Sequence, residues 1–308
     1  MEGDSGVARQ QAKPSNRLIY GLLSLMLAFW SGNFIIGKWA LRELPPVLAG
    51  ALRVVCASAL VLPLYFWERR RAGNRQPTNT ELPMVLLFAV GGISLNQVLF
   101  MVGLANTTVA HSSILVTLNP IVVLLMARFF GVERLTARRV VGMSVAATGV
   151  LVLQLWSSPG VVSQSGPSLM GDSFIVLSTL MLAAFMVLGK PVIGHHSAIT
   201  VTTCAYVGAA VALTPVSLWL YRDFPFHRVS AGAWLSVLYM ALFPSVLAYM
   251  IFSYALKHIG PTRLAAVTYM QPLLATSLAA CTLGETITVP VVASGAVICS
   301  GVFIAERS

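Results

Sequence analysis

Ten apolar stretches follow one another along almost the whole chain, each close to the roughly 20 residues that an α-helix needs to cross a bilayer. Short segments with charges, prolines or glycines separate them. Of the 308 residues, 57% are hydrophobic and only 10% are charged, whereas an ordinary soluble domain has roughly 25% charged residues. We therefore expect an all-α membrane protein in which no folded domain lies outside the membrane.

The positions of the breaks predict ten transmembrane helices. They cover residues 18–39, 46–67, 82–103, 108–130, 138–156, 169–189, 200–221, 232–254, 262–283 and 288–304. The basic tail and the first apolar stretch superficially resemble a signal peptide, but the stretch is too long for one and has no obvious cleavage site. We expect this stretch to remain as the first helix.

The distribution of basic residues predicts how the helices are oriented. If the ten helices alternate across the bilayer, 15 of the 20 Lys and Arg residues lie on one side and 4 on the other. Arg53 alone is assigned to neither side, because it lies well inside a predicted helix. Cytoplasmic loops carry an excess of Lys and Arg, so both termini are predicted to be cytoplasmic, with residues 1–17 as a cytoplasmic tail.

The sequence matches itself at an offset of 152 positions. The informative matches join residue types that are scarce in this chain: Lys38 with Lys190, Pro120 with Pro272, and Glu133 with Glu285. The offset predicts a first five-helix repeat over residues 18–156 and a second over 169–305. Residues 157–168 are then a periplasmic linker between the two.

Each repeat has five helices, and five is odd, so the second copy enters the membrane from the opposite face. The fold class is therefore predicted as ten transmembrane helices in two inverted five-helix repeats. Many secondary carriers use this architecture and hold the substrate near the midplane, between halves that rock against each other. Symmetric halves can form outward-open and inward-open states from one set of contacts.

Three segments resemble the EamA type of the drug/metabolite transporter superfamily, and the resemblance covers essentially the whole chain. They are PPVLAGALRVVCASALVLP, whose Arg53 matches the family's arginine in the second helix, TLNPIVVLLMARFFGVERLTARRVVGMSVAATGVLV, and its counterpart TYMQPLLATSLAACTLGETITVPVVASGAVICSGVFI. The resemblance implies a ten-helix exporter of small metabolites, often amino acids or related compounds, in a bacterial inner membrane. The second repeat departs from the first by having Ala205 where the first has Arg53.

Polar and aromatic side chains in the middle of the predicted helices form the candidate substrate-binding site. They are Trp30, Asn33, Asn96, Gln97, Asn119, Tyr249, Tyr269 and Gln271. The offset relates Gln97 to Tyr249 and Asn119 to Gln271, and equivalent positions of inverted halves are expected to approach one another near the symmetry axis. The alternative is that these groups only hold the bundle together, through interhelical hydrogen bonds of about 0.6 kcal/mol each.

Arg53 and two prolines have two interpretations each. A charged side chain within the membrane is costly, so Arg53 is expected either to bind an anionic group such as a substrate carboxylate, or to cap carbonyls or reach the outer headgroups. Pro120 and Pro272 lie within predicted helices and remove a backbone hydrogen bond there. Each predicts a kink that acts as a hinge or is a static bend.

Every Asp and Glu lies in a loop, a tail or a helix end, so the usual group for proton or sodium coupling is missing from the membrane centre. We therefore expect facilitated diffusion or exchange. The four cysteines, Cys56, Cys204, Cys281 and Cys299, lie in apolar stretches without metal-ligand spacing. The sequence predicts no metal, no cofactor, no catalytic residues and no nucleic-acid partner.

The leading hypothesis is a secondary transporter that exports small metabolites by alternating access. Other solutes, such as drugs or nucleotide sugars, are an alternative within the same class. A non-transporting membrane scaffold is an alternative from another class, although a scaffold has no use for inverted symmetry. An intramembrane enzyme would need a nucleophile, base or metal cluster that the sequence does not show. The expected partners are a small-molecule substrate and the lipid bilayer, and the sequence leaves the oligomeric state open.

Overall fold

The computed structural model describes residues 15–72, 82–107, 112, 115–116, 118–132, 134, 136–156, 168–190, 196–271, 274 and 289–306. This part of the chain consists of helices and the turns that join them, and no β-strand occurs in it. Most of the predicted cytoplasmic tail and of the predicted linker lies outside the described residues. The same is true of Glu133, Glu285 and Pro272.

The helices follow the predicted order through both halves of the chain. In the first half they are α1 (Asn16–Ala40), α2 (Pro46–Ala72), α3 (Leu82–Ala89), η1 (Val90–Leu95), α4 (Asn96–Asn106), α6 (Asn119–Phe129) and α7 (Ala137–Trp156). In the second half they are α8 (Leu169–Leu188), α10 (Ala198–Leu220), η2 (Phe226–Arg228), α11 (Ala231–Met240), η3 (Ala241–Leu247), α12 (Ala248–His258), α13 (Pro261–Val267), η4 (Thr268–Met270) and α15 (Val289–Glu306).

Several of these helices are long and apolar enough to cross a membrane by themselves. Among the described residues they are Asn16–Ala40, Pro46–Arg70, Leu169–Leu188, Ala198–Leu220 and Ala231–His258. Shorter apolar helices cover Val90–Asn106, Asn119–Phe129 and Val292–Ala305. With the two repeats, these helices make the protein an all-α, ten-helix membrane protein, as predicted.

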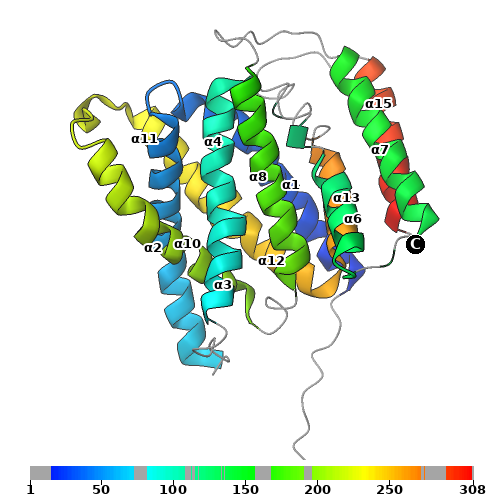
Figure 1. Ribbon diagram of the computed structural model, residues 1–308, viewed down its shortest axis with the longest axis horizontal. Helices are drawn as coiled ribbons and strands as arrows, with labels where there is room; N and C mark the ends of the chain where they lie inside the picture. The colour runs from blue at the N-terminus through cyan, green and yellow to red at the C-terminus, as the bar shows by residue number, and fades with distance from the viewer. Residues whose placement is uncertain are drawn as a thin grey trace, which may run out of the picture.

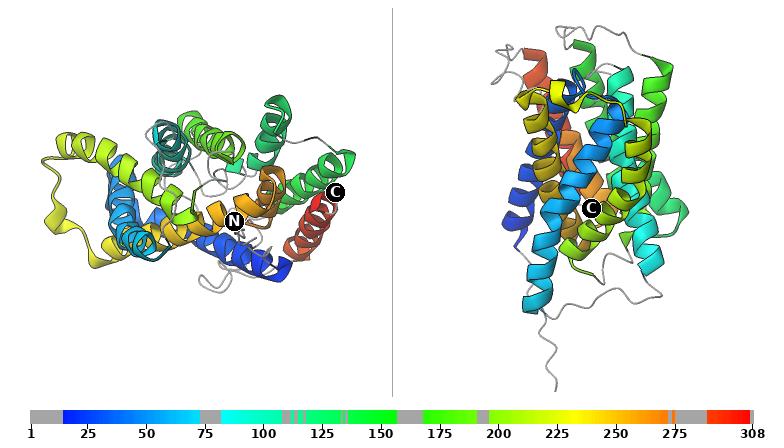
Figure 2. Two further views of the ribbon diagram at one scale, coloured as in Figure 1. Left: turned by 90° about the horizontal axis from the view of Figure 1, so that it is seen from below. Right: turned by 90° about the vertical axis from the view of Figure 1, so that its left-hand side faces the viewer.

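The last helices of the two halves, α7 and α15, cross each other in opposite directions. Gly142 lies against Gly301 and Ala305, whereas Gly149, further along α7, lies against Ser294 and Ile298, which come earlier in α15. α7 and α15 are equivalent helices of the two repeats, so their antiparallel contact shows that the repeats are inverted. Figures 1 and 2 show this pair side by side at one end of the molecule.

The two halves are interleaved, so that helices of one pack on helices of the other. The equivalent helices α2 and α10 contact each other, as do α6 and α13 (Figure 1). In addition, α1 packs on α11 and α12, and α4 packs on α8. The centre of the bundle is therefore an interface between the repeats, and side chains of both halves meet there.

The third helix of each repeat contains a π-helical segment at the same place. Subtracting the offset of 152 from the ends of η3, Ala241–Leu247, gives 89–95, and η1 covers Val90–Leu95. Pro244 lies in η3, whereas η1 contains Gly92, which packs against Phe185 of α8. π-helical turns are rare and occur frequently at functional sites. Two such segments at equivalent positions indicate that the functional site lies in the region between the halves.

Candidate functional site

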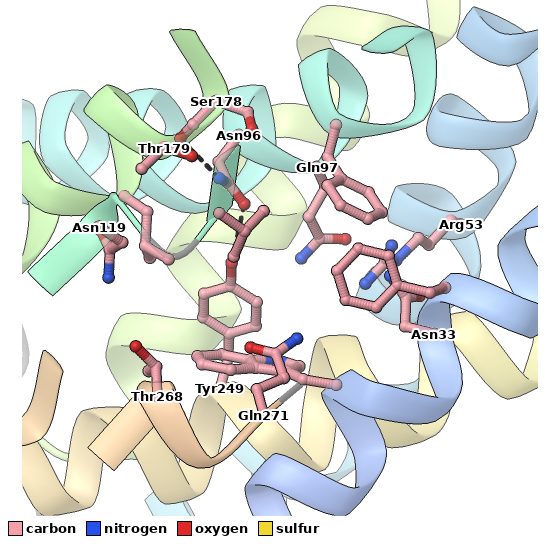
Figure 3. Close-up of a pocket in the computed structure, with 15 residues that line it drawn as sticks. Asn33, Arg53, Asn96, Gln97, Asn119, Ser178, Thr179, Tyr249, Thr268 and Gln271 are labelled. Carbon is pink, nitrogen blue, oxygen red and sulfur yellow. Dashed lines mark hydrogen bonds between the residues drawn. The ribbon is translucent and has the colours of Figure 1, made fainter. Parts of the chain in front are cut away.

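A cavity lies between the halves, surrounded by helices of both repeats (Figure 3). Its volume is about 70 Å³, several times the roughly 10–15 Å³ that one water molecule needs by the same measure. The lining is a mixture of amides, hydroxyls, aromatic rings and one guanidinium group. It consists of Trp30, Asn33, Phe34, Arg53, Asn96, Gln97, Phe100, Val116, Asn119, Ser178, Thr179, Leu182, Tyr249, Thr268 and Gln271.

Seven of the eight residues predicted to bind substrate line this cavity: Trp30, Asn33, Asn96, Gln97, Asn119, Tyr249 and Gln271. Both pairs that the offset relates are among them, so equivalent positions of the two halves do meet in one place. Tyr249 also packs its ring against the indole of Trp30, with the ring centroids 5.6 Å apart. The structure thus brings together polar side chains that are more than 200 residues apart in sequence.

Tyr269 does not line the cavity. It is fully buried in a separate apolar cluster with Leu124, Met143 and Ile298, between α6, α7 and α15. Thr268 and Gln271 both line the cavity. Thr268 begins the short helix η4, and Gln271 follows its last residue. Residues three apart share a helix face, whereas Tyr269 is about a third of a turn away from Thr268 and points elsewhere.

Asn96 connects the two halves across the cavity. Its Nδ2 donates to the backbone carbonyl of Ser178 in α8 at 2.7 Å, and its Oδ1 accepts a hydrogen bond from the Tyr249 hydroxyl at 3.0 Å (Figure 3). Asn96 comes directly after the π-helical segment η1. Its amide therefore links the third helix of the first repeat to two helices of the second.

Arg53 is held by a buried network that sequence reasoning did not predict. Its Nε donates to the Ser245 hydroxyl at 2.7 Å, and that hydroxyl lies 2.9 Å from Gln97 Oε1. Gln97 Nε2 donates to the Tyr206 hydroxyl, which donates to the Ser245 carbonyl at 3.0 Å. All four residues are at most 2% exposed. The network joins helices of both repeats and fixes the guanidinium group.

The burial of Arg53 excludes one of the environments predicted for it. A side chain that is 2% exposed does not extend to the protein surface, so the expectation that it reaches the outer headgroups is wrong. Its guanidinium group lines the cavity instead. Within the described chain, no carboxylate lies within 4.0 Å of it, and its terminal nitrogens have no hydrogen-bond partner.

Pro120 lies at the start of α6. The helix described there begins at Asn119, with Pro120 in its first turn, and Leu118 before it is in a turn that returns to the carbonyl of Leu115. The backbone is therefore interrupted next to the cavity, where Asn119 lies. The hinge at Pro120 stays a prediction, and Pro272 lies outside the described residues.

Several residues of the site were not predicted from the sequence. Ser178 and Thr179 line the cavity and form a hydroxyl pair at the centre of α8, which was a usable signal. Tyr206 is completely buried and holds Gln97. Tyr206 directly follows Ala205, the counterpart of Arg53 in the second repeat, so the alignment of the repeats could have indicated this position. Phe34 and Phe100, whose rings are 5.4 Å apart, resemble ordinary apolar residues in the sequence.

Comparison with known proteins identifies the family of this chain. The model of the EamA-like transporter family matches twice, over residues 17–155 and 169–306. The chain belongs to the EamA-like transporter family. An uncharacterized transporter of Archaeoglobus fulgidus is 27% identical over 267 residues, which are 86% of this chain and 89% of the relative.

A second relative has a more specific name. A probable terminal-alkyne amino-acid exporter of Streptantibioticus cattleyicolor is 26% identical over 236 residues, 76% of each chain. A solved crystal structure of 18% identity has the same fold, with a TM-score of 0.75 over 95% of this chain and 98% of the other. This EamA-like protein is therefore a multi-pass membrane transporter, and its cavity lies where its two family repeats meet.

Proposed function

We propose that this EamA-like transporter exports small polar or amphipathic metabolites, such as amino acids or related compounds, by alternating access. The cavity between the repeats carries the proposal, because its lining combines hydrogen-bonding amides and hydroxyls with the rings of Trp30 and Tyr249. Such a lining suits a small molecule with both polar and apolar parts. The relative named as a probable amino-acid exporter supports the same substrate class.

The structure supports alternating access through features that occur in both halves. The π-helical segments η1 and η3 lie at equivalent positions beside the cavity, and each touches the second helix of the other half. Irregular turns of this kind are sites where a membrane helix can bend. Since the repeats are inverted, one set of movements opens the cavity to either side of the membrane.

A bacterial inner membrane with both termini in the cytoplasm completes the proposal. The orientation of the termini follows from the 15 to 4 distribution of Lys and Arg between the two sides. Reporter fusions after the last helix test this orientation: a fluorescent protein is expected to fold in the cytoplasm, and a fused alkaline phosphatase is expected to be inactive. The opposite result would reverse the direction of the proposed transport.

A substrate panel in sealed vesicles tests the function. Flux of amino acids and related compounds is compared between the wild type, Asn119→Ala and Gln271→Ala, which remove equivalent amides from the two sides of the cavity. Asn16→Ala, the same kind of change at the exposed start of α1, is the matched control. Both cavity variants are expected to lose most flux at equal expression. Unchanged flux in both would rule out this cavity as the binding site.

A further inference from the structure

The charge of the cavity is unbalanced. Arg53 is the one ionisable cation among the described lining residues, and that lining contains no carboxylate. An arginine side chain keeps its charge at any physiological pH. A buried charge without an opposite partner is strongly unfavourable, so a site of this kind is stabilised by a ligand that brings one negative charge.

The guanidinium group is prepared for such a ligand. An arginine has five N–H donors, and only the one on Nε is used, by the Ser245 hydroxyl at 2.7 Å. The contact fixes the plane of the group and leaves its two terminal nitrogens without a partner in the described structure. Two such nitrogens match the two oxygens of a carboxylate.

Two amide oxygens in the same cavity also lack partners. Asn33 Oδ1 and Asn119 Oδ1 are buried and accept no hydrogen bond, although their side chains are only 6% and 2% exposed. Figure 3 places Asn33 beside Arg53 and Asn119 at the other end of the cavity. A buried acceptor without a donor is unfavourable, so both positions call for a ligand with O–H or N–H groups.

These observations distinguish three kinds of ligand. A zwitterion brings a carboxylate but also an ammonium group, which leaves the net charge of the occupied cavity at one positive unit. A neutral amide leaves Arg53 unpaired. A monoanion with neutral donors pairs the guanidinium group and supplies hydrogen bonds to Asn33 and Asn119, which are uncharged and do not neutralise an ammonium ion.

From this, and resting on the proposed export function, we infer that the transported species is a small carboxylate monoanion with neutral hydrogen-bond donors, such as a 2-hydroxy acid. Arg53 binds the carboxylate, and Ser245, Gln97 and Tyr206 position the guanidinium group. Transport moves net negative charge. In a cell whose interior is negative, outward movement of an anion is electrically favourable and needs no coupling ion.

Proteoliposomes with purified full-length protein test the inference. The probes are two matched series, the natural amino acids and the 2-hydroxy acids with the same side chains, together with the 2-hydroxy amides as neutral members. Uptake is measured with and without an inside-positive potassium diffusion potential set by valinomycin, and protein-free vesicles correct for passive diffusion. For at least one side chain, the hydroxy acid is expected to be taken up faster than the amino acid and the amide, and faster still with the potential.

Variants assign the effect to Arg53. Arg53→Gln is expected to lower uptake of the hydroxy acid by about tenfold to a hundredfold, the usual effect of removing a hydrogen bond from a charged group. Arg53→Lys should keep the preference for the monoanion over the amide. Ser245→Ala keeps the charge but releases Nε, and is expected to reduce that preference partly. Arg42→Gln removes a charge from the exposed segment after α1 and is the matched control.

The possible results separate this inference from the export proposal. Equal uptake of amino and hydroxy acids by the wild type, without an effect of the potential, would overturn the inference and leave amino-acid export intact. This comparison needs no variant, so it holds even if Arg53→Gln fails to fold, which a melting curve in detergent reveals. If no member of either series is transported, the export proposal fails, and the inference fails with it.

Discussion

Lys38 and Lys190, which the repeat places 152 positions apart, make the same contact at the ends of their helices. Lys38 Nζ donates to the carbonyl of Thr107 at 3.0 Å, and Lys190 Nζ donates to the carbonyl of Ile259 at 3.3 Å, 69 residues further along in both cases. Thr107 and Ile259 are the extended residues that end α4 and α12. Each lysine thus binds a terminal carbonyl of another helix of its own repeat.

The first prediction concerns these lysines. Lys38→Met and Lys190→Met are each expected to lower the free energy of unfolding by about 1.5 kcal/mol, the low end for a hydrogen bond from a charged group. Melting temperatures of the purified proteins in one detergent measure the effect. Arg42→Met, which removes an exposed cation, should leave the melting temperature unchanged. A loss in only one lysine variant would show that the two contacts are not energetically equivalent.

Two adjacent glycines of η1 give a matched pair for the second prediction. A Cβ on Gly92 would lie 2.8 Å from the ring carbon Cγ of Phe185, whereas a Cβ on Gly91 would meet nothing within 4 Å. Gly92→Ala should therefore destabilise the protein by about 1–3 kcal/mol through overpacking. Gly91→Ala is the control, and its melting curve should follow that of the wild type. Similar behaviour of both variants would mean that η1 and α8 separate easily here.

The third prediction concerns the crossing of α7 and α15. A Cβ on Gly142 would lie 2.7 Å from the Gly301 carbonyl oxygen, and a Cβ on Gly301 would lie 2.6 Å from that of Gly142. Backbone atoms cannot rotate away, so Gly142→Leu and Gly301→Leu must push the helices apart. Each should lose about 3 kcal/mol, the upper end for overpacking, in unfolding experiments in detergent. Gly21→Leu, at an open position of α1, should be tolerated.

Glu43 and Ser230 form a contact outside the membrane-spanning segments that depends on pH. The Ser230 hydroxyl donates to Glu43 Oε1 at 2.6 Å, and the Ser230 backbone N–H donates to Oε2 at 2.7 Å. These bonds lower the pKa of Glu43 below its ordinary value, the side-chain bond contributing most. Ser230 also caps the start of α11 by accepting from the Ala233 N–H.

The fourth prediction follows from the direction of that shift. A carboxyl group whose pKa is lower in the folded state stabilises the fold above its unfolded pKa of about 4.3, and the contribution is lost as the pH falls through the folded value. Melting temperatures between pH 7 and pH 3 should therefore converge for the wild type and Glu43→Gln at the acid end. Asp223→Asn, at an exposed carboxylate beside Arg222, is the control. A constant difference between the wild type and Glu43→Gln over this range would contradict the prediction.

The sequence predicts the helices and their duplication because both depend on local properties. Apolar length marks a membrane helix, and the match of Lys38 with Lys190 marks the repeat. Their acceptors, Thr107 and Ile259, could not be predicted. Each accepts through its backbone carbonyl, which every residue has, and their side chains are chemically unlike. The π-helical segments were not predicted either, because the two copies of this backbone shape have different sequences: η1 contains glycines where η3 contains Pro244.

The site shows the same limit. Asn119 and Gln271 were identifiable because a polar side chain is conspicuous in an apolar helix and its partner follows from the offset. The environment of Arg53 was not, because its burial depends on Ser245, Gln97 and Tyr206 of three other helices. Tyr269 was assigned to the cavity from its residue type alone. The face on which it lies depends on the rotation of the backbone around η4.

The contact between α7 and α15 is nearly self-complementary, since Gly142 lies against Gly301, and their equivalents at the offset of 152, Ser294 and Gly149, lie against each other as well. Two copies of a single repeat, inserted into the bilayer in opposite orientations, would present the same small residues to each other. A half-length ancestor could therefore have assembled as an antiparallel dimer before gene fusion joined its copies. Fusion would then have allowed a charge such as Arg53 to arise on one side only, which a dimer of identical chains cannot achieve.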